Sequence, residues 1–111
     1  MCLMDVFYAL AEPRRRKIIE LLAREGQLSA TQIYKEFNVT AQAISQHLKI
    51  LLDAKLLNME KRAQQRLYSL NADSMLEVEE WASQTTKLWE ERFDSLERVL
   101  ETQKRKNAKN R

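Results

Sequence analysis

Glycine, proline and cysteine are scarce in this sequence, which has one residue of each among its 111 residues. An all-β fold needs many turns, and turns are rich in glycine and proline, so the composition favours a mainly helical protein. The single cysteine, Cys2, excludes an intramolecular disulfide and a multi-cysteine metal site within one chain. It fits a reducing compartment, so we expect a cytoplasmic protein with an unconstrained terminal thiol; pairing across a dimer or a response to oxidants is the alternative.

Long apolar runs are also absent. No stretch approaches the roughly 18 apolar residues of a transmembrane helix, so we expect no membrane partner. Asp5 interrupts the apolar start of the chain, and the basic cluster at residues 14–17 follows that start, which argues against a signal peptide. The length suits one domain with a modest core, which we place at residues 1–102. A basic disordered tail is expected at residues 103–111.

The side chains that enzymes use for catalysis are sparse as well. The chain has one histidine and one cysteine. It has no glycine-rich phosphate-binding loop and no nucleophile paired with a base. We therefore expect a protein that is not an enzyme and that binds no cofactor.

Charge is unevenly distributed along the chain, although the net charge is only +3. Residues 1–70 carry 11 Lys or Arg and 7 Asp or Glu, residues 71–102 carry 3 and 9, and residues 103–111 carry 5 and none. A basic first part beside an acidic segment suggests a molecule with one face for an anionic partner.

Two short helices separated by a tight turn are predicted for residues 29–54. Ser29 and Gln32 are spaced as a capping box, in which each side chain bonds to the backbone N–H of the other residue. Ile33 and Phe37 lie four residues apart and give the first helix a buried stripe. Thr40 then caps the second helix, which we place at residues 40–54.

The second of these helices has two chemically different faces. Aliphatic residues recur at helical spacing and predict one buried face; they are Ile44, Leu48, Leu51 and Leu52. On the other face, glutamine can pair with adenine, serine and threonine can bond to either base partner, and alanine can contact a thymine methyl group. Lysine suits a phosphate contact. We predict that this face reads DNA, and the alternative is an ordinary solvated face. The predicted base-reading residues are Thr40, Gln42, Ala43, Ser45 and Gln46, and the predicted phosphate contact is Lys49.

Two further helices are predicted before this pair, the first at residues 3–11. Pro13 opens the second, where its missing N–H costs nothing, and Gly26 stands where that helix ends. The basic run at residues 14–17 fills the first turn of the second helix, where cations oppose the helix dipole. That run is either a phosphate contact or an exposed turn held by salt bridges.

Two alternating runs at residues 57–70 predict a β-hairpin. The link between them has no glycine, asparagine or aspartate, so we expect a connection of more than two residues. A basic hairpin that directly follows two such helices is placed to reach the DNA backbone or the minor groove. The predicted contacts of this wing are Arg62, Gln64, Gln65 and Arg66.

One long helix is predicted for residues 72–102, and at about 45 Å it is longer than a small domain is wide. Its apolar stripe reaches almost to its end. A chain of this size cannot cover the whole stripe, so we predict a two-fold homodimer. Packing of the stripe onto the first helix is the alternative, and both can hold together. The predicted dimerisation residues are Val6, Phe7 and Leu10 in the first helix and Val78, Trp81, Thr85, Leu88, Trp89, Phe93 and Leu96 in the last.

Four blocks of sequence carry a resemblance to a known family: FYALAEPRRR at residues 7–16, LS at 28–29, AISQHLK at 43–49 and RLYSL at 66–70. In their order and spacing, over residues 3 to about 70, the chain resembles winged-helix transcription repressors of the ArsR family. The resemblance implies a dimer held by the first and last helices. It also implies a recognition helix, here residues 40–49, in the major groove of double-stranded DNA with the wing beside it.

The chain departs from the family's pattern at several positions. Glu12 stands where aspartate is usual, and Lys55 stands where glycine usually ends the recognition helix; a non-glycine residue in the left-handed conformation costs about 1 kcal/mol. Metal-sensing members have a cysteine pair where this chain has residues 32–34, and others use histidines on the last helix, where this chain has none. The resemblance therefore implies a subgroup without the usual metal sites. His47 matches a position that is commonly histidine, and we expect it to make a half-buried polar contact between helices.

The resulting hypothesis is a homodimeric repressor of transcription that binds a pseudo-palindromic operator, with no inducer assigned. The alternative is a winged-helix protein-interaction module that acts through its C-terminal helix without specific DNA binding. Salt separates the two, because DNA binding weakens steeply as salt rises whereas an apolar interface does not.

Overall fold

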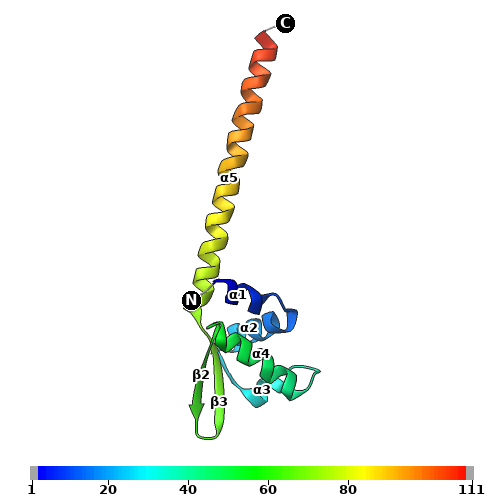
Figure 1. Cartoon of the computed structure of the whole chain (residues 1–111), viewed down its shortest axis with the longest axis vertical. Helices are drawn as coiled ribbons and strands as arrows, with labels where there is room; N and C mark the ends of the chain where they lie inside the picture. The colour runs from blue at the N-terminus through cyan, green and yellow to red at the C-terminus, as the bar shows by residue number, and fades with distance from the viewer. Residues whose placement is uncertain (1–2, 110–111) are drawn as a thin grey trace. The chain divides into compact units, whose positions relative to one another are not determined.

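The computed structural model describes residues 3–109 and confirms a mainly helical winged-helix fold (Figure 1). Cys2 and the last two residues lie outside the described part. The elements in chain order are α1 (Leu3–Leu10), α2 (Pro13–Glu25), β1 (Gln27–Ser29), α3 (Ala30–Lys35), α4 (Ala41–Asp53), β2 (Leu57–Arg62), β3 (Gln65–Leu70) and α5 (Ala72–Lys109).

The first 78 residues contain the hydrophobic core. Helices α2, α3 and α4 pack with the small sheet, and α1 packs on α2 and α4. The largest fully buried side chains come from helices α1 to α4 and from the turn before β2, and they include Val6, Ile18, Leu22, Ile33, Ile44, Leu48, Leu51 and Leu56. Val6 is fully buried within the chain, so the prediction that it belongs to a dimer interface is wrong.

Local capping chemistry sets the helix ends where the sequence predicts them. The Ser29 hydroxyl accepts the Gln32 N–H at 3.2 Å, and the Gln32 side chain accepts the Ser29 N–H at 2.9 Å, which confirms the capping box. The Thr40 side chain accepts the Ala43 N–H and starts α4. Gly26 ends α2 with a φ of 88°, a conformation that favours glycine.

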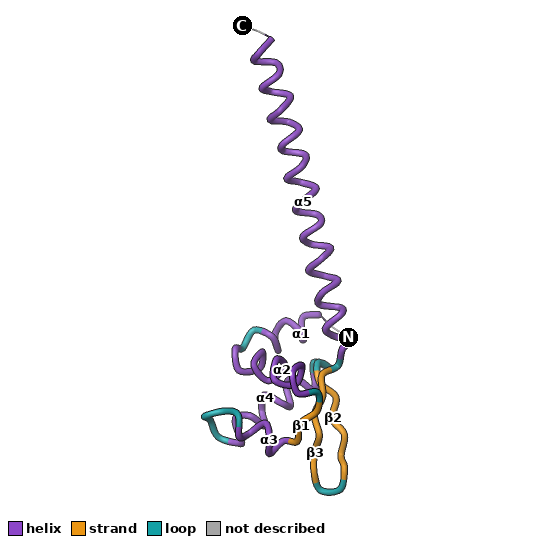
Figure 2. The backbone as a smooth tube through the Cα atoms, turned by 180° about the vertical axis from the view of Figure 1, so that it is seen from behind, coloured by secondary structure: helices purple, strands orange, loops and turns teal. Residues whose placement is uncertain are grey.

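Three strands form an antiparallel sheet in the order β1-β3-β2 (Figure 2). The predicted hairpin is present, but β1 was not predicted; it pairs Gln27–Ser29 with the middle of β3. The β2–β3 register pairs Arg62 with Gln65, so only residues 63 and 64 make the turn. The expectation of a longer connection is wrong, because Ala63 adopts a φ of 57° and supplies the left-handed conformation usually left to glycine.

The turn after α4 confirms the left-handed residue expected at Lys55, which has a φ of 62°. Its carbonyl oxygen accepts hydrogen bonds from the Asn71 side-chain amide, at 2.9 Å, and from the Ser74 hydroxyl. The Asn71 side-chain oxygen in turn accepts the Asp73 N–H at the start of α5. These bonds offset the strain at Lys55 and fasten the beginning of α5 to the end of α4.

Helix α5 continues to Lys109, beyond the predicted end at residue 102. The expected disordered tail is therefore helical over residues 103–109, because Gln, Lys and Arg are good helix formers and no proline or glycine interrupts them. The chain also divides into two compact units, the first ending at Val78 and the second beginning at Glu79. This division differs from the single domain expected at residues 1–102.

Candidate nucleic-acid interface

Helix α4 separates its side chains into a buried and an exposed face. Ile44, Leu48 and Leu51 are buried in the core. The polar side chains of the other face point outward, and Gln42, Ser45, Gln46 and Lys49 are exposed. Ala43, at the edge of that face, is half-buried. Because hydrophobic contacts fix the inner face, the outer face presents amide, hydroxyl and ammonium groups from a rigid support.

Thr40 differs from the other predicted base-reading residues because its side chain has a structural task. Its hydroxyl oxygen accepts the Ala43 N–H at 3.1 Å and caps α4. A cap of this kind stabilises a helix by about 1 kcal/mol. The hydroxyl proton of Thr40 remains available for an acceptor outside the protein, since Thr40 is exposed.

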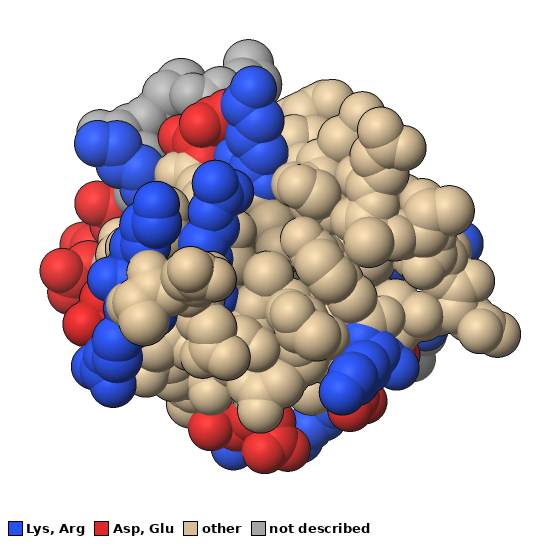
Figure 3. All heavy atoms as spheres, turned by 90° about the horizontal axis from the view of Figure 1, so that it is seen from below, with Lys and Arg blue, Asp and Glu red and all other residues tan. Residues whose placement is uncertain are grey.

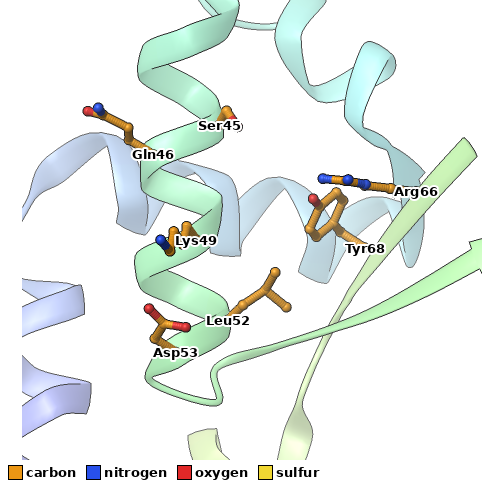
Figure 4. Close-up of a pocket in the computed structure, with 7 residues that line it drawn as sticks. All are labelled: Ser45, Gln46, Lys49, Leu52, Asp53, Arg66 and Tyr68. Atoms are coloured by element: carbon orange, nitrogen blue, oxygen red, sulfur yellow. The ribbon is translucent and has the colours of Figure 1, made fainter.

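A hollow of about 250 Å³ lies between α4 and β3 and brings part of the predicted site together. Figure 4 shows Arg66 extending from β3 toward α4, whereas Gln46 points away from β3. Thr40, Gln42 and Ala43 do not line the hollow, and neither do the wing-tip residues. Asp53 lines it and was not predicted. The lining residues are Ser45, Gln46, Lys49, Leu52, Asp53, Arg66 and Tyr68.

The wing carries a second unpredicted feature, a pair of like charges. Lys61 and Arg66 are directly opposite each other in the β2–β3 register, so their side chains share one face of the hairpin. Like charges in that position are destabilising unless an anion lies between or beside them. Arg62 instead pairs with Glu60 at 3.2 Å, with both groups exposed, and Gln64 and Gln65 are exposed at the tip. The sequence does contain a signal for this pair. With a two-residue turn between the strands, the alternation of strand residues puts Lys61 and Arg66 on the same face of the hairpin.

Figure 3 shows one face of the molecule, with uncharged atoms across its middle and Lys and Arg side chains gathered mainly along one side. Residues without a charged side chain are thus flanked by positive charge and, at the edges, by some Asp and Glu. Neutral hydrogen-bonding groups suit base edges, and positive charges suit phosphates.

In the basic run at residues 14–17, Arg15 is buried, whereas Arg14, Arg16 and Lys17 are exposed as one of the two predicted alternatives required. Arg15 is 6% exposed, and its guanidinium donates to the carbonyl oxygen of Ala9 at 2.7 Å and of Tyr8 at 3.1 Å. It also lies over the Tyr8 ring, 5.3 Å from the ring centre. Arg16 donates to the carbonyl oxygen of Leu10 at 2.6 Å. These arginines bind the carbonyl end of α1, where cations complement the helix dipole.

His47 makes the half-buried contact between helices that the sequence predicts. Its Nδ1 atom lies 3.3 Å from Arg15 Nη1, and its Nε2 atom lies 3.8 Å from Glu12 Oε2. Glu12 caps α2 by accepting the Arg15 backbone N–H at 3.0 Å. Desolvation raises the pKa of Glu12, but hydrogen bonds from the backbone of Arg15 and Arg14 and the charges of His47 and Arg15 outweigh it and hold that pKa below its ordinary value.

The second unit exposes most of the predicted dimerisation residues. Trp89 is 66% exposed and Phe93 is 55% exposed, and the neighbouring positions on the same stripe of α5 are similarly open. Phe7, Leu10 and Val78 are half-buried in the first unit, and Tyr8, which was not predicted, is 64% exposed. The exposed large side chains of α5 are Leu76, Trp81, Leu88, Trp89, Phe93, Leu96, Val99 and Leu100.

Comparison with known proteins shows the family to which this chain belongs. A family profile described as a helix-turn-helix domain matches residues 10–60. The transcriptional repressor SdpR of Bacillus subtilis (strain 168) is 36% identical over 77 residues, which cover 69% of this chain and 84% of that protein. The arsenical resistance operon repressor of the same organism is 36% identical over 69 residues, covering 62% of this chain and 66% of that repressor. The chain belongs to the ArsR family.

A solved structure places this ArsR-family chain in the same fold. The crystal structure of the ArsR family transcriptional regulator RHA00566 superposes with a TM-score of 0.73 at 27% identity, covering 79% of this chain and 90% of that one. The family consists of transcriptional regulators, so this chain is a DNA-binding regulator and not an enzyme. Within the described residues, none of the helices has the combination of length and hydropathy that crossing a bilayer requires.

Proposed function

We propose that this ArsR-family regulator is a cytoplasmic homodimeric repressor that binds a pseudo-palindromic operator through α4 and the β2–β3 wing. The observation that carries the proposal is the exposed polar face of α4, which meets Arg66 of the wing around one hollow. Gln42, Ser45 and Gln46 are exposed, and the structure records no side-chain hydrogen bond from them to the rest of the described chain. Their donors and acceptors are thus available to base edges.

Base reading and phosphate binding fall to different side chains in this proposal. Gln42, Ser45 and Gln46 project from the face of α4 that would enter the major groove, where glutamine pairs with adenine through two hydrogen bonds. Ala43 would contact a thymine methyl group, and the Thr40 hydroxyl would donate to a nearby acceptor. Phosphates would be bound by Lys49 and the wing residues Arg62, Gln64, Gln65 and Arg66.

The wing pair of Lys61 and Arg66 supports an anionic partner at this place. Two cations side by side on a hairpin repel each other in the free protein. A phosphate between them would turn that repulsion into two favourable charged contacts. We therefore add Lys61 to the proposed phosphate contacts.

The exposed stripe of α5 supports the homodimer. Trp89, Phe93 and Leu96 recur at spacings of four and three residues, so they lie along one face of the helix. Large apolar side chains in such a contiguous, exposed row are typical of a surface that another protein covers. A second copy of this chain would give two recognition helices related by two-fold symmetry, which suits half-sites about 34 Å apart.

Substitution of Gln46 by alanine tests the groove assignment. Gln46→Ala should weaken binding to the preferred operator by roughly 1–3 kcal/mol and relax the base preference at one position of each half-site. Fluorescence polarisation against the operator and its single-base variants measures both effects. Gln84→Ala, which removes an exposed glutamine from α5, is the matched control and should leave both unchanged. Unaltered affinity and base preference in Gln46→Ala would show that this face of α4 does not read DNA.

A further inference from the structure

The contact between Arg15 and His47 joins the recognition helix to the corner formed by α1 and α2. His47 lies on α4 directly after Gln46, on the half-buried side of the helix. Arg15 is almost completely buried and holds the last carbonyl groups of α1 with two of its nitrogen atoms. One side chain thus links the N-terminal helix, α2 and α4.

The chemistry of the two partners fixes the proton on His47. A guanidinium has only donors and keeps its charge at every pH at which proteins fold, so Arg15 Nη1 must donate to His47 Nδ1. His47 Nδ1 must then be unprotonated, and the ring proton of the neutral imidazole must be on Nε2. That Nε2–H faces the Glu12 carboxylate, which lies 3.8 Å away. Both ring nitrogens therefore have a partner of the right kind only when His47 is neutral.

We propose that neutral His47 is a positioning residue for DNA binding: by accepting from Arg15 it holds α4 at the angle from which its outer face meets the major groove. Core packing of Ile44, Leu48 and Leu51 turns one face of α4 inward, but aliphatic contacts are not directional. The hydrogen bond to Arg15 is directional and lies beside Gln46, so it restrains rotation of the helix about its axis. The proposal rests on the proposed DNA contacts of α4.

Protonation of His47 would disrupt this arrangement. A proton on Nδ1 removes the acceptor that Arg15 uses and places two cations 3.3 Å apart. Glu12 is the one acidic group recorded against His47 in the described chain, and its carboxylate already accepts the Arg15 backbone N–H. The charged groups that face His47 are thus Arg15 and Glu12, both at the start of α2. The guanidinium of Arg15 also lies over the Tyr8 ring of α1, 5.3 Å from the ring centre.

The expected direction of the pH effect distinguishes positioning from simple electrostatics. A cation gained on a DNA-binding helix should strengthen DNA binding as pH falls, because it adds a positive charge near phosphates. The positioning role predicts the opposite, a weaker complex at low pH. His47 is the only histidine of the chain, so no other imidazole can change the charge of the protein between pH 7.5 and 5.5. Glu12 stays ionised over this range because its pKa is held below the ordinary value.

The test measures operator affinity between pH 7.5 and 5.5 at constant ionic strength. For the unmodified protein we expect affinity to fall roughly tenfold over this range, the scale of one hydrogen bond to a charged group. His47→Phe, which has no acceptor, should bind about tenfold more weakly at every pH. His47→Asn carries a carbonyl oxygen close to the position of Nδ1 and does not titrate, so it should restore most of that affinity and show no pH response. Affinity that rises or stays constant on acidification, or an equal pH response in His47→Asn, would overturn the proposal.

A second measurement needs no DNA and separates this proposal from the proposed function. Nitrogen NMR of the protein labelled in its one histidine reports which ring nitrogen carries the proton. We expect the tautomer protonated at Nε2 at pH 7.5, with Nδ1 as the hydrogen-bond acceptor. A ring protonated at Nδ1 at pH 7.5 would refute the positioning role even if the protein binds its operator as proposed. The expected tautomer together with no binding to any DNA would instead refute the proposed function and, with it, the role of His47 there.

Discussion

A protein carrying Phe93→Glu and Leu96→Glu is expected to be monomeric and to bind its operator at least about a hundredfold more weakly than the unmodified protein. Both side chains are exposed on the apolar stripe of α5. In a dimer they would be covered, and a carboxylate buried there without a partner is strongly unfavourable. The operator affinity would fall because each half-site would then have to be bound independently. Sedimentation analysis measures the mass, and fluorescence polarisation measures the affinity.

The matched control carries the same charges on the opposite face of the same helix. Ser83 and Lys87 are exposed and lie ten and six residues before Phe93, so at 3.6 residues per turn they project from the side of α5 opposite the apolar stripe. A Ser83→Glu and Lys87→Glu protein should remain dimeric and bind the operator almost normally. Loss of the dimer in the control, or retention of the dimer in the Phe93→Glu and Leu96→Glu protein, would show that this stripe is not the interface.

Substitution of the adjacent residues Leu48 and Lys49 of α4 by alanine should affect different properties, the stability of the fold in the first case and DNA binding in the second. Leu48 is buried in the core, and Leu48→Ala should lower the free energy of unfolding by about 2–5 kcal/mol. Lys49 is exposed beside the hollow, and Lys49→Ala should change the stability by less than about 0.5 kcal/mol. Lys49→Ala should instead weaken DNA binding and reduce the slope of log affinity against log salt by about 1.

Thermal unfolding and salt titration of operator binding distinguish these two effects. Each variant replaces one side chain with alanine in the middle of the same helix, so each serves as the control for the other. If Lys49→Ala destabilises the fold as much as Leu48→Ala, or leaves the salt slope unchanged, the division of α4 into a core face and a phosphate-binding face is wrong.

Much of the fold follows from chemistry that is local in the sequence. Capping pairs such as Ser29 with Gln32 involve residues three apart, so they set helix ends before any tertiary contact forms. The alternation at residues 57–70 and the amphipathic pattern of α4 likewise depend on neighbouring residues. These features predicted the helix-turn-helix, the hairpin and the outward-facing polar residues of α4.

The remaining features depend on contacts between residues far apart in the sequence. Strand β1 has three residues and no pattern of its own, and it exists because β3 pairs with it. Arg15 sits in a basic run that resembles an exposed turn, but the carbonyl end of α1 and His47, 32 residues away, provide it with acceptors in the interior. Val6 is buried because α1 packs into the core, which its own sequence does not reveal. At Ala63 the strand register imposed a conformation that turn chemistry alone disfavours.

Selection of bound duplexes from a random library, at near-physiological salt and with excess competitor DNA, tests the central claim most directly. The protein is used unmodified, and its mass is measured in the same buffer. An inverted repeat with half-sites about one helical turn apart is the predicted result, because two α4 helices of a symmetric dimer would enter successive major grooves. No enriched sequence from a folded dimer would contradict the claim and would favour a module that acts through α5 on other proteins.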